Sequence, residues 1–323
     1  MHRRTFIASL GGAVALPFAA RAQQAMPVIG FLRPSSLNDS KNFVASFRQG
    51  LKETGFVEGQ NVALEYRYAD NQGDRLPALA AELIRRPVAV LATASSAALV
   101  AKAATTTVPI LFTGGGDPVR QGLVTSLNRP GGNVTGVTFL AGQLGTKRLE
   151  LLRQIVPKAT TVGVLVIPNF TESEDERRDL QTAAQIIGQQ LIVFDVSNER
   201  DIDQAFASFA QRGVGAVVVG SGAFLTSKRN EVVALAARHA LPASYSLREF
   251  ADAGGLMSYG TSITDAYRQI GVYAGRILKG EKPGDLPVLQ SSKFEFVINL
   301  KTAKALGLEF HPQLLATADE VIE

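Results

Sequence analysis

The stretch "VAVLATASSAALVAKAATTTVPILFTGGGDP", residues 88–118, contains the repeating unit from which the fold can be predicted. It begins with a short apolar run, continues as an alanine-rich segment, and returns to a second apolar run, "VPILF", before three glycines, an aspartate and a proline. Short apolar runs bounded by turn residues are typical of buried strands, and the alanine-rich segment between them favours a helix. Residues 88–118 therefore predict a strand, a helix and a second strand that ends in a tight turn.

The same alternation of strand and helix is found on both sides of this unit. Before residue 129 we expect strands at 27–32, 61–69, 88–95 and 108–116. The helices expected there are one through Phe43, Phe47 and Leu51 that stops at Gly55, one over 76–84, an alanine-rich one within 92–104, and one from Gln121. "RPGGNVTGV", residues 129–137, is a Pro- and Gly-rich break between two halves of the chain. Beyond it we expect strands at 160–168, 191–196, 214–220, 241–246, 254–260 and 293–300, with helices over 143–156, 175–190, 202–209, 230–238, 263–277 and 301–308.

This pattern predicts an α/β fold with two Rossmann-like lobes. Each half holds about four strand–helix units, and strands separated by helices of this length form parallel sheets covered on both faces. One helix and one strand remain after two complete lobes, which indicates that the chain crosses back between them. A hinge between the lobes would then consist of several strands.

The N-terminal stretch "MHRRTFIASLGGAVALPFAARAQQA" has the pattern of a secretory signal peptide. Basic residues precede an apolar segment, and a small-x-small site ends at Ala22, where we expect cleavage. The pair Arg3-Arg4 before Thr5 is typical of a twin-arginine signal, with an ordinary Sec signal or an uncleaved anchor as the alternatives. We therefore expect residues 1–22 to be removed and the mature protein to be periplasmic.

Composition excludes several classes of function. Without residues 1–22 the chain keeps 30 of its 33 Lys and Arg against 29 Asp and Glu, and it has no basic stripe that would bind nucleic acid. The absence of cysteine removes disulfides, thiolate catalysis and most zinc sites. His239 and His311 stand in no nucleophile or metal context, and no hydrolase or metalloprotease motif occurs. We expect no catalytic residues, no metal and no cofactor.

The glycine turn after residue 112 is not a nucleotide-binding loop. "TGGGDP" lacks the Lys and Ser/Thr of a phosphate loop and does not match the dinucleotide-binding fingerprint. Two interpretations stay open: a structural turn, or one lip of a ligand cleft. Asp117 either caps the following turn or accepts a hydrogen bond from a ligand ammonium group.

Four separated stretches resemble the ABC-transporter substrate-binding proteins of the tryptophan/tyrosine-binding type. They are "DPVRQGLVTSLNRPGGNVTGV", "KRLELLRQIVP", "LPASYSLREFADAGGLMSYG" and "SSKFEFVINLKTAKALGLEFHPQLLATADEVIE". The resemblance implies a periplasmic-binding-protein type I fold, with a ligand held between two lobes and a three-stranded hinge. We expect one lobe over 26–140 plus 261–286 and the other over 141–260 plus 287–323.

Candidate ligand-binding residues follow from the rule that ligands lie outside the carboxyl ends of parallel strands. They are Ser95, Ser96, Thr113, Gly114, Asp117, Asn169, Phe170, Ser221, Gly222, Tyr245 and Tyr259. The two serines could instead cap the alanine-rich helix, and the tyrosines could pack in the core. Ile167-Pro168-Asn169 stands where the family frequently has Tyr-Asn-Pro, which weakens any transfer of an aromatic specificity.

We therefore expect an exported, monomeric binding protein that is not an enzyme. It would capture a small polar solute, an amino acid or a similar carboxylate, and deliver it to an ABC permease in the inner membrane. One alternative is a sensor subunit that presents its closed form to a membrane receptor. The other is an exported hydrolase.

Overall fold

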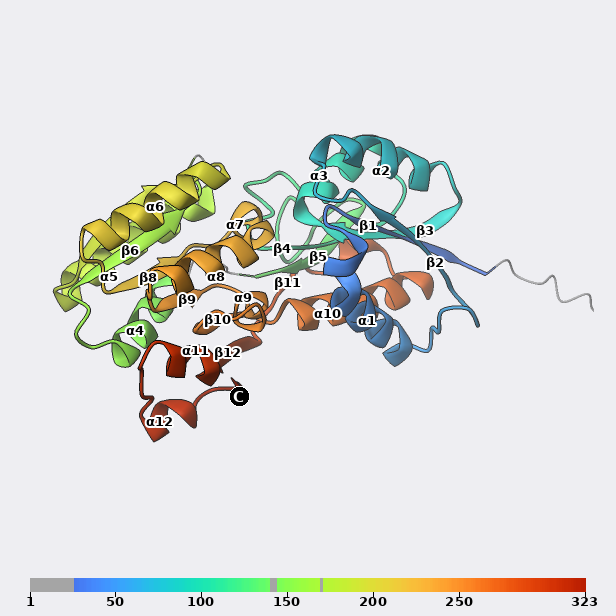
Figure 1. The fold of residues 1–323 in the computed structure, drawn as a ribbon. Helices are drawn as coiled ribbons and strands as arrows, with labels where there is room; N and C mark the ends of the chain where they lie inside the picture. Colours follow the sequence, from blue (N-terminus) through green and yellow to red (C-terminus); the bar gives the residue numbers. More distant parts are fainter. Residues whose placement is uncertain (1–25, 140–143, 169–170) are drawn as a thin grey trace, which may run out of the picture.

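The protein, examined as a computed structural model, folds into two α/β lobes that lie side by side (Figure 1). The structure describes residues 26–139, 144–168 and 171–323. Each lobe is built around its own sheet, with strand order β11-β5-β4-β3-β1-β2 in the first and β13-β12-β10-β9-β8-β6-β7 in the second. The expectation of two lobes with central parallel sheets is confirmed.

The first sheet is parallel throughout. Its strands are β1 (Val28–Arg33), β2 (Ala63–Tyr68), β3 (Val88–Ala94), β4 (Ile110–Gly114), β5 (Val134–Thr138) and β11 (Leu289–Gln290). Four helices cover its two faces: α1 (Leu37–Glu53) with α10 (Ile263–Leu278), and α2 (Leu76–Ile84) with α3 (Ser95–Ala104). Both faces are therefore buried, which explains why the strands are nearly continuous apolar runs.

Helices α1 and α10 contact one another through their backbones. A Cβ atom at Gly50 would lie 1.9 Å from the Arg268 carbonyl oxygen, and one at Gly271 would lie 2.2 Å from that of Phe47. Only glycine allows so close an approach. The contact fixes α10, which follows directly after a crossing between the lobes, against the helix that begins the first lobe.

The second sheet is mixed. Its strands are β6 (Thr161–Val166), β7 (Gln190–Asp195), β8 (Ala216–Val219), β9 (Ala243–Tyr245), β10 (Met257–Thr261), β12 (Phe294–Asn299) and β13 (Glu320–Ile322). Strands β6 to β10 are parallel, whereas β12 runs antiparallel to β10. The helices are α4 (Gly145–Ile155), α5 (Thr171–Ile187), α6 (Glu199–Gln211), α7 (Ala223–Ser227), α8 (Arg229–Arg238), α9 (Arg248–Asp252), α11 (Leu300–Ala305) and α12 (Pro312–Leu315).

The chain passes between the lobes three times. It leaves the first sheet after β5, returns after β10 into α10, and leaves again between β11 and β12. Strand β11 pairs with β5, so residues 289–290 belong to the first sheet, although the expected boundary assigned everything after residue 286 to the second lobe. Several connecting segments between two lobes are typical of a hinge about which lobes can close.

Two expectations about the segment between β4 and β5 are wrong. No helix starts at Gln121, because Gly122 adopts a φ of +72° and the backbone there forms isolated turns. Part of the expected Pro/Gly break is instead the buried strand β5. Its Gly136 is required by packing, since a Cβ atom there would lie 2.1 Å from the Phe112 carbonyl oxygen.

Candidate functional site

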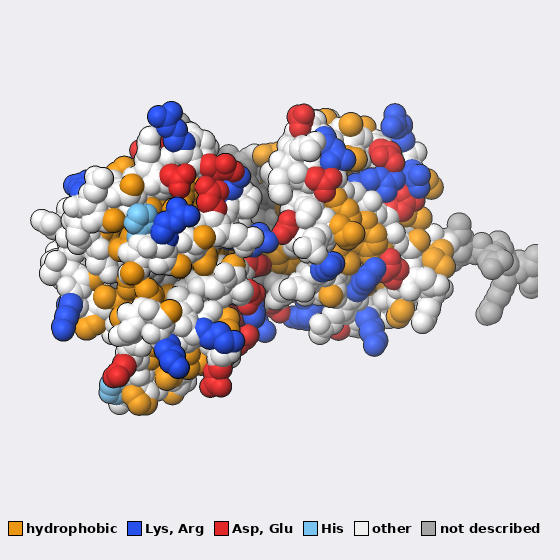
Figure 2. Space-filling view, in the orientation of Figure 1, with side chains coloured by type: hydrophobic (Ala, Val, Ile, Leu, Met, Phe, Trp, Pro, Cys, Tyr) orange, Lys and Arg blue, Asp and Glu red, His pale blue; other side chains and the backbone are white. Residues whose placement is uncertain are grey.

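The carboxyl ends of the parallel strands are followed by segments that meet between the lobes. Arg229, at the start of α8, places Nη2 2.7 Å from Oδ1 of Asp39 in the first turn of α1. Arg120, in the turn after β4, places Nη1 3.5 Å from Oδ2 of Asp175 in α5. Charged side chains of both signs gather along the hollow between the two lobes (Figure 2).

A cavity of about 210 Å³ lies in this region, lined by residues from both lobes. Asp39, Asn42 and Phe43 of α1 and Thr264 of α10 come from the first lobe, and Arg248, Glu249 and Asp252 of α9 come from the second. Helix α10 begins directly after the chain crosses between the lobes, so the cavity lies beside the hinge. A small ligand in this cavity would contact both lobes at once.

Arg33 is the last residue of β1 and is only 8% exposed. Its Nη2 and Nε atoms donate to the hydroxyls of Ser35 and Ser40, at 3.2 and 3.4 Å. The guanidinium carbon lies 5.0 Å from the ring centroids of both Phe43 and Tyr267. In the described part of the chain it forms no ion pair, and burial lowers its pKa to about 10.

Glu249, in α9, is the corresponding unpaired acid on the second lobe. The residue is half-buried, but its Oε2 atom is fully buried and has no hydrogen-bond partner in the described chain. Burial raises the pKa of Glu249, and the nearby negative charge of Asp252 raises it further. The positive charges of Arg229 and Arg248 act in the opposite direction and lower it. A buried carboxylate oxygen without a partner is unfavourable unless a ligand satisfies it.

The other charges around the cavity are paired. Asp39 accepts from Ser36 as well as from Arg229, and the Ser36 hydroxyl is the largest cause of its lowered pKa. Arg248 contacts Asp252 at 3.4 Å and Glu320 at 3.0 Å. By contrast, neither Arg33 nor Glu249 forms a salt bridge with another residue that the structure describes.

The predicted residues of the first lobe lie at the expected strand ends. Thr113 and Gly114 are buried at the end of β4, and the Gly114 carbonyl oxygen accepts from Thr138 Oγ1 at 3.2 Å. Asp117 is exposed, and its Oδ1 accepts from the backbone N–H groups of Val119 and Arg120 at 2.8 and 3.2 Å. Asp117 thus holds the turn that reaches Asp175 of the other lobe.

The first turn of α3 carries the two predicted serines. Ser96 is exposed, and the N-cap residue is Ala94, which provides no side-chain cap. Only backbone can be described for Ser95. The serines follow the end of β3, next to β4 in the sheet.

Ser221 and Gly222 follow the end of β8. A buried ion pair beneath the surface contacts Ser221. Arg148 of α4 and Glu176 of α5 are both 0% exposed and contact each other directly. Glu176 Oε2 accepts from the Ser221 backbone N–H at 2.9 Å, and Arg148 Nη2 donates to Ser221 Oγ at 3.4 Å. Gly222 adopts a φ of +146°.

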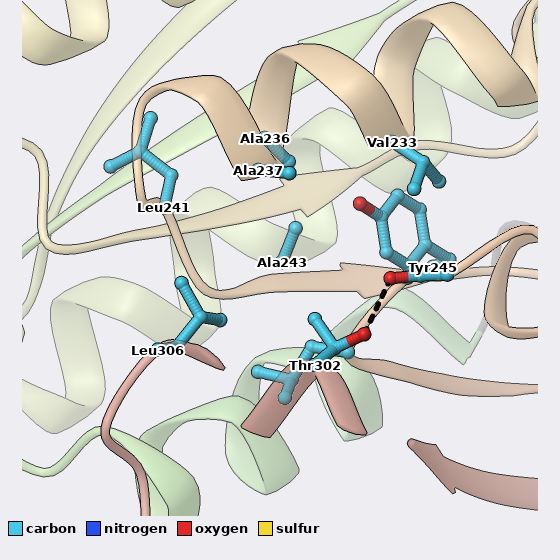
Figure 3. A pocket seen from close by; sticks show the side chains of 11 residues that line it. Val233, Ala236, Ala237, Leu241, Ala243, Tyr245, Thr302 and Leu306 are labelled. Atoms are coloured by element: carbon cyan, nitrogen blue, oxygen red, sulfur yellow. Dashed lines mark hydrogen bonds between the residues drawn. The ribbon is translucent and has the colours of Figure 1, made fainter. Parts of the chain in front are cut away.

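The structure does not bring the predicted tyrosines to the cavity. Tyr245 is 1% exposed and packs on Phe250 with ring centroids 4.8 Å apart. Figure 3 shows its ring inside the second lobe, near Val233 of α8, where it lines a small pocket of about 10 Å³. Tyr259 packs against Phe294 and Phe296, both with centroids 6.2 Å away.

The residues predicted from the sequence and the residues found at the cavity differ. Asn169 and Phe170 lie outside the described residues. Sequence reasoning missed Phe43 and Glu249, which line the interlobe cavity, and Arg33, whose guanidinium lies 5.0 Å from the Phe43 ring centroid. The available signals were an arginine directly after the apolar run "VIGFL" and an acid four residues after the strand that ends at Tyr245.

The described residues contain neither a metal-binding cluster nor a membrane-spanning helix. No group of three or more His, Cys, Asp or Glu side chains there could hold a metal ion. No helix in the same residues has the length and apolar character that a membrane span requires.

Two lobes joined by three crossings, with a charged cavity between them, define a binding protein of the periplasmic type I fold. The match to the family model "ABC transporter substrate binding protein" covers residues 28–322, and the chain belongs to this family. Members of this family are substrate-binding proteins and not enzymes.

Relatives agree with this assignment. A tyrosine-binding protein of Clostridioides difficile is 26% identical over 292 residues, which cover 90% of this chain and 83% of the relative. A solved ABC domain from Streptococcus pneumoniae in complex with L-Trp is 25% identical, with a TM-score of 0.78, and the match covers 91% of this chain and 100% of that one. A conserved domain protein from Vibrio cholerae, at 24% identity and a TM-score of 0.81 over 92% of this chain and 99% of that chain, shares the fold.

Proposed function

We propose that this protein is exported, captures an amino acid between its two lobes and delivers it to an ABC permease. The observation that carries the proposal is the interlobe cavity. Both lobes contribute to its lining, which combines acids, a base and an aromatic ring. Such a lining suits a small polar solute that carries charge. The names of two relatives, a tyrosine-binding protein and a domain in complex with L-Trp, support an amino acid as the solute.

Capture would be coupled to closure of the lobes. Ligand contacts to α1 on one side and α9 on the other favour the closed arrangement by their differential binding energy. The Arg229–Asp39 ion pair joins α8 of the second lobe to α1 of the first and would add to this preference. The closed form of the monomer would then be the form that the permease recognises.

The expected ligand-binding residues remain part of the proposal where their position supports it. In the first lobe, Thr113 and Gly114 end β4, Asp117 lies in the turn that follows, and Ser96 lies in the first turn of α3. Ser221 and Gly222 follow β8 in the second lobe. The proposed division into lobes is 26–140 plus 261–286 and 141–260 plus 287–323, with β11 remaining in the first sheet. Export would follow from the N-terminal pattern of residues 1–22, with cleavage after Ala22.

The test uses residues 23–323, unfolded and refolded to remove any ligand carried through purification. Thermal unfolding is recorded with L-tyrosine, L-tryptophan, the other amino acids, sugars and nucleosides. A ligand at 100 times its Kd adds about 2.7 kcal/mol to the free energy of unfolding. We expect a shift with amino acids and no turnover of the bound compound; a shift with sugars or nucleosides alone would contradict the proposed solute class.

A further inference from the structure

A buried ion pair in the second lobe joins four segments that are distant in the sequence. Arg148 of α4 and Glu176 of α5 are both 0% exposed and contact each other directly. Arg148 donates from Nη2 to Ser221 Oγ and from Nη1 to the Tyr259 carbonyl oxygen, both at 3.4 Å. Glu176 Oε2 accepts from the Ser221 backbone N–H at 2.9 Å. The pair therefore connects α4, α5, the segment after β8 and strand β10.

Stability alone does not account for this pair. Burying two charges has a desolvation cost that their attraction only partly offsets, so apolar side chains of similar size often stabilise a core equally well or better. The cost is increased here, because the Nε atom of Arg148 is buried and has no hydrogen-bond partner in the described chain. What such a pair can supply instead is one fixed arrangement of the segments that it joins, since charged hydrogen bonds require defined directions.

The segment after β8 is held through every polar group of Ser221. The ion pair contacts its N–H and its hydroxyl, and the hydroxyl of Ser173, near the start of α5, donates to its carbonyl oxygen at 3.4 Å. A Cβ atom at the preceding residue, Gly220, would lie 2.5 Å from the Leu165 carbonyl oxygen, so this part of the chain runs directly against β6. The ion pair thus fixes a segment that has little room for other conformations.

Two of the joined segments lead toward the first lobe. Asp175, next to Glu176 in α5, places Oδ2 3.5 Å from Nη1 of Arg120, which belongs to the first lobe. Strand β10 ends at Thr261 and continues directly into α10, which packs on the first sheet. The ion pair therefore lies between a contact of the two lobes and one of the crossings that connect them.

We propose that Arg148 and Glu176 are positioning residues for solute capture. They hold the segment after β8 and the start of α5 in one arrangement relative to β10, so that the second lobe presents a preformed surface to the first. This inference rests on the proposed capture of a solute between the lobes and adds two buried residues that act through their neighbours. A preformed surface favours tight binding, because little conformational entropy is lost when the lobes close on the solute.

The test separates positioning from stability with the double variant Arg148→Met/Glu176→Leu, which removes both charges. Titration calorimetry on the refolded mature protein, below the unfolding transition of each variant, uses L-tyrosine as the probe, or the compound that gives the wild type a larger thermal shift. Arg148→Lys, which keeps a positive charge opposite Glu176, is measured in parallel and decides the outcome if the double variant fails to fold. Lys147→Met/Glu150→Leu, which alters the exposed pair on the same helix, is the matched control.

We expect the double variant to bind the probe at least about tenfold more weakly than the wild type. Its Ser221 N–H should also exchange hydrogen faster in the ligand-free protein, because that group has lost its acceptor. Arg148→Lys should weaken binding at least about threefold, since an ammonium group does not reproduce the directions of the guanidinium fork. The control should change neither quantity. A purely structural role would lower the unfolding midpoint and leave the affinity of the folded protein unchanged.

The results that would overturn the inference differ from the result that would overturn capture. If the folded double variant, or Arg148→Lys in its place, binds the probe as the wild type does, the positioning role is wrong while capture of a solute stands. A loss of affinity in the double variant without faster exchange at Ser221 would also contradict the inference, because the loss would then have another cause. If no compound of any class shifts thermal unfolding of the folded wild type, both the inference and the proposed function are contradicted.

Discussion

Replacing Arg148 with Met should strongly destabilise the second lobe. Arg148 and Glu176 are both 0% exposed, so the substitution leaves a buried carboxylate without its counter-charge. Removing one partner of a buried ion pair typically costs about 3–5 kcal/mol. The same range applies to Glu176→Leu, which leaves the guanidinium buried and unpaired.

The double variant Arg148→Met/Glu176→Leu should be more stable than either single variant. Replacing both charges by apolar side chains of similar size is often close to neutral. One cost remains, because the Ser221 backbone N–H, which donates to Glu176 Oε2 at 2.9 Å, loses its acceptor. A buried donor without a partner costs about 1–3 kcal/mol, so we expect the double variant to be destabilised by that amount.

Urea unfolding of the mature chain at neutral pH, followed by circular dichroism, measures all four proteins of this cycle. A change in midpoint with an unchanged slope reports stability alone. The exposed pair Lys147–Glu150 on the same helix is the control, and its cycle should give less than about 1 kcal/mol of coupling. If the losses in the Arg148 and Glu176 single variants add up in the double variant, the two side chains are not coupled and the reasoning is refuted.

Three further predictions concern Glu249, Arg229 and Gly222. Glu249→Gln should stabilise the ligand-free protein by about 1 kcal/mol at neutral pH, measured by urea unfolding, because it removes a buried unpaired carboxylate. Because burial raises the pKa of Glu249, the free energy of unfolding of the wild type falls as pH rises through that raised value. In acid, below the ordinary glutamate pKa, the difference in stability between wild type and variant should vanish. Arg229→Ala should weaken ligand binding by at most about fivefold in calorimetry, and less at high salt, because its pair with Asp39 is partly exposed. Gly222→Ala should cost about 1–3 kcal/mol in urea unfolding, because φ is +146° and a Cβ atom would lie 2.3 Å from Ile167 Cδ1.

Each of these three predictions has a control variant or a result that would contradict it. A stability difference for Glu249→Gln that stays constant from acid to neutral pH would show that titration of Glu249 is not its cause. Removing the Arg75–Asp70 pair, which lies within the first lobe, should not change ligand affinity. Gly73→Ala should be nearly neutral, since nothing lies within 4 Å of a Cβ atom there.

Sequence patterns predicted most of the strands and helices because burial on both sheet faces leaves a clear apolar signal. The strand expected at 27–32 is Val28–Arg33, and the helix expected over 263–277 is Ile263–Leu278. The pattern failed for β5, where Gly and Thr residues occupy a buried strand between β11 and β4 and the neighbouring strand supplies the hydrogen bonds. It also failed after Gln121, where Gly122 has a positive φ.

The site was less predictable because it depends on contacts between distant segments. Arg33 becomes notable only when Tyr267, from the helix that crosses back into the first lobe, packs on its guanidinium. Tyr245 follows the expected rule of lying at a strand end, but every residue of β9 is buried, and its ring points into the core. The position of a residue along its strand predicts at which end of the sheet the residue lies. The direction in which its side chain points depends on how the sheet packs against its neighbours.

The most direct test of capture between the lobes is a crystal structure of the refolded mature protein with the amino acid that gives the largest thermal shift. The account predicts ligand density between α1 and α9, with contacts to both lobes. Density for the ligand on only one lobe, away from the residues that line the interlobe cavity, would contradict it.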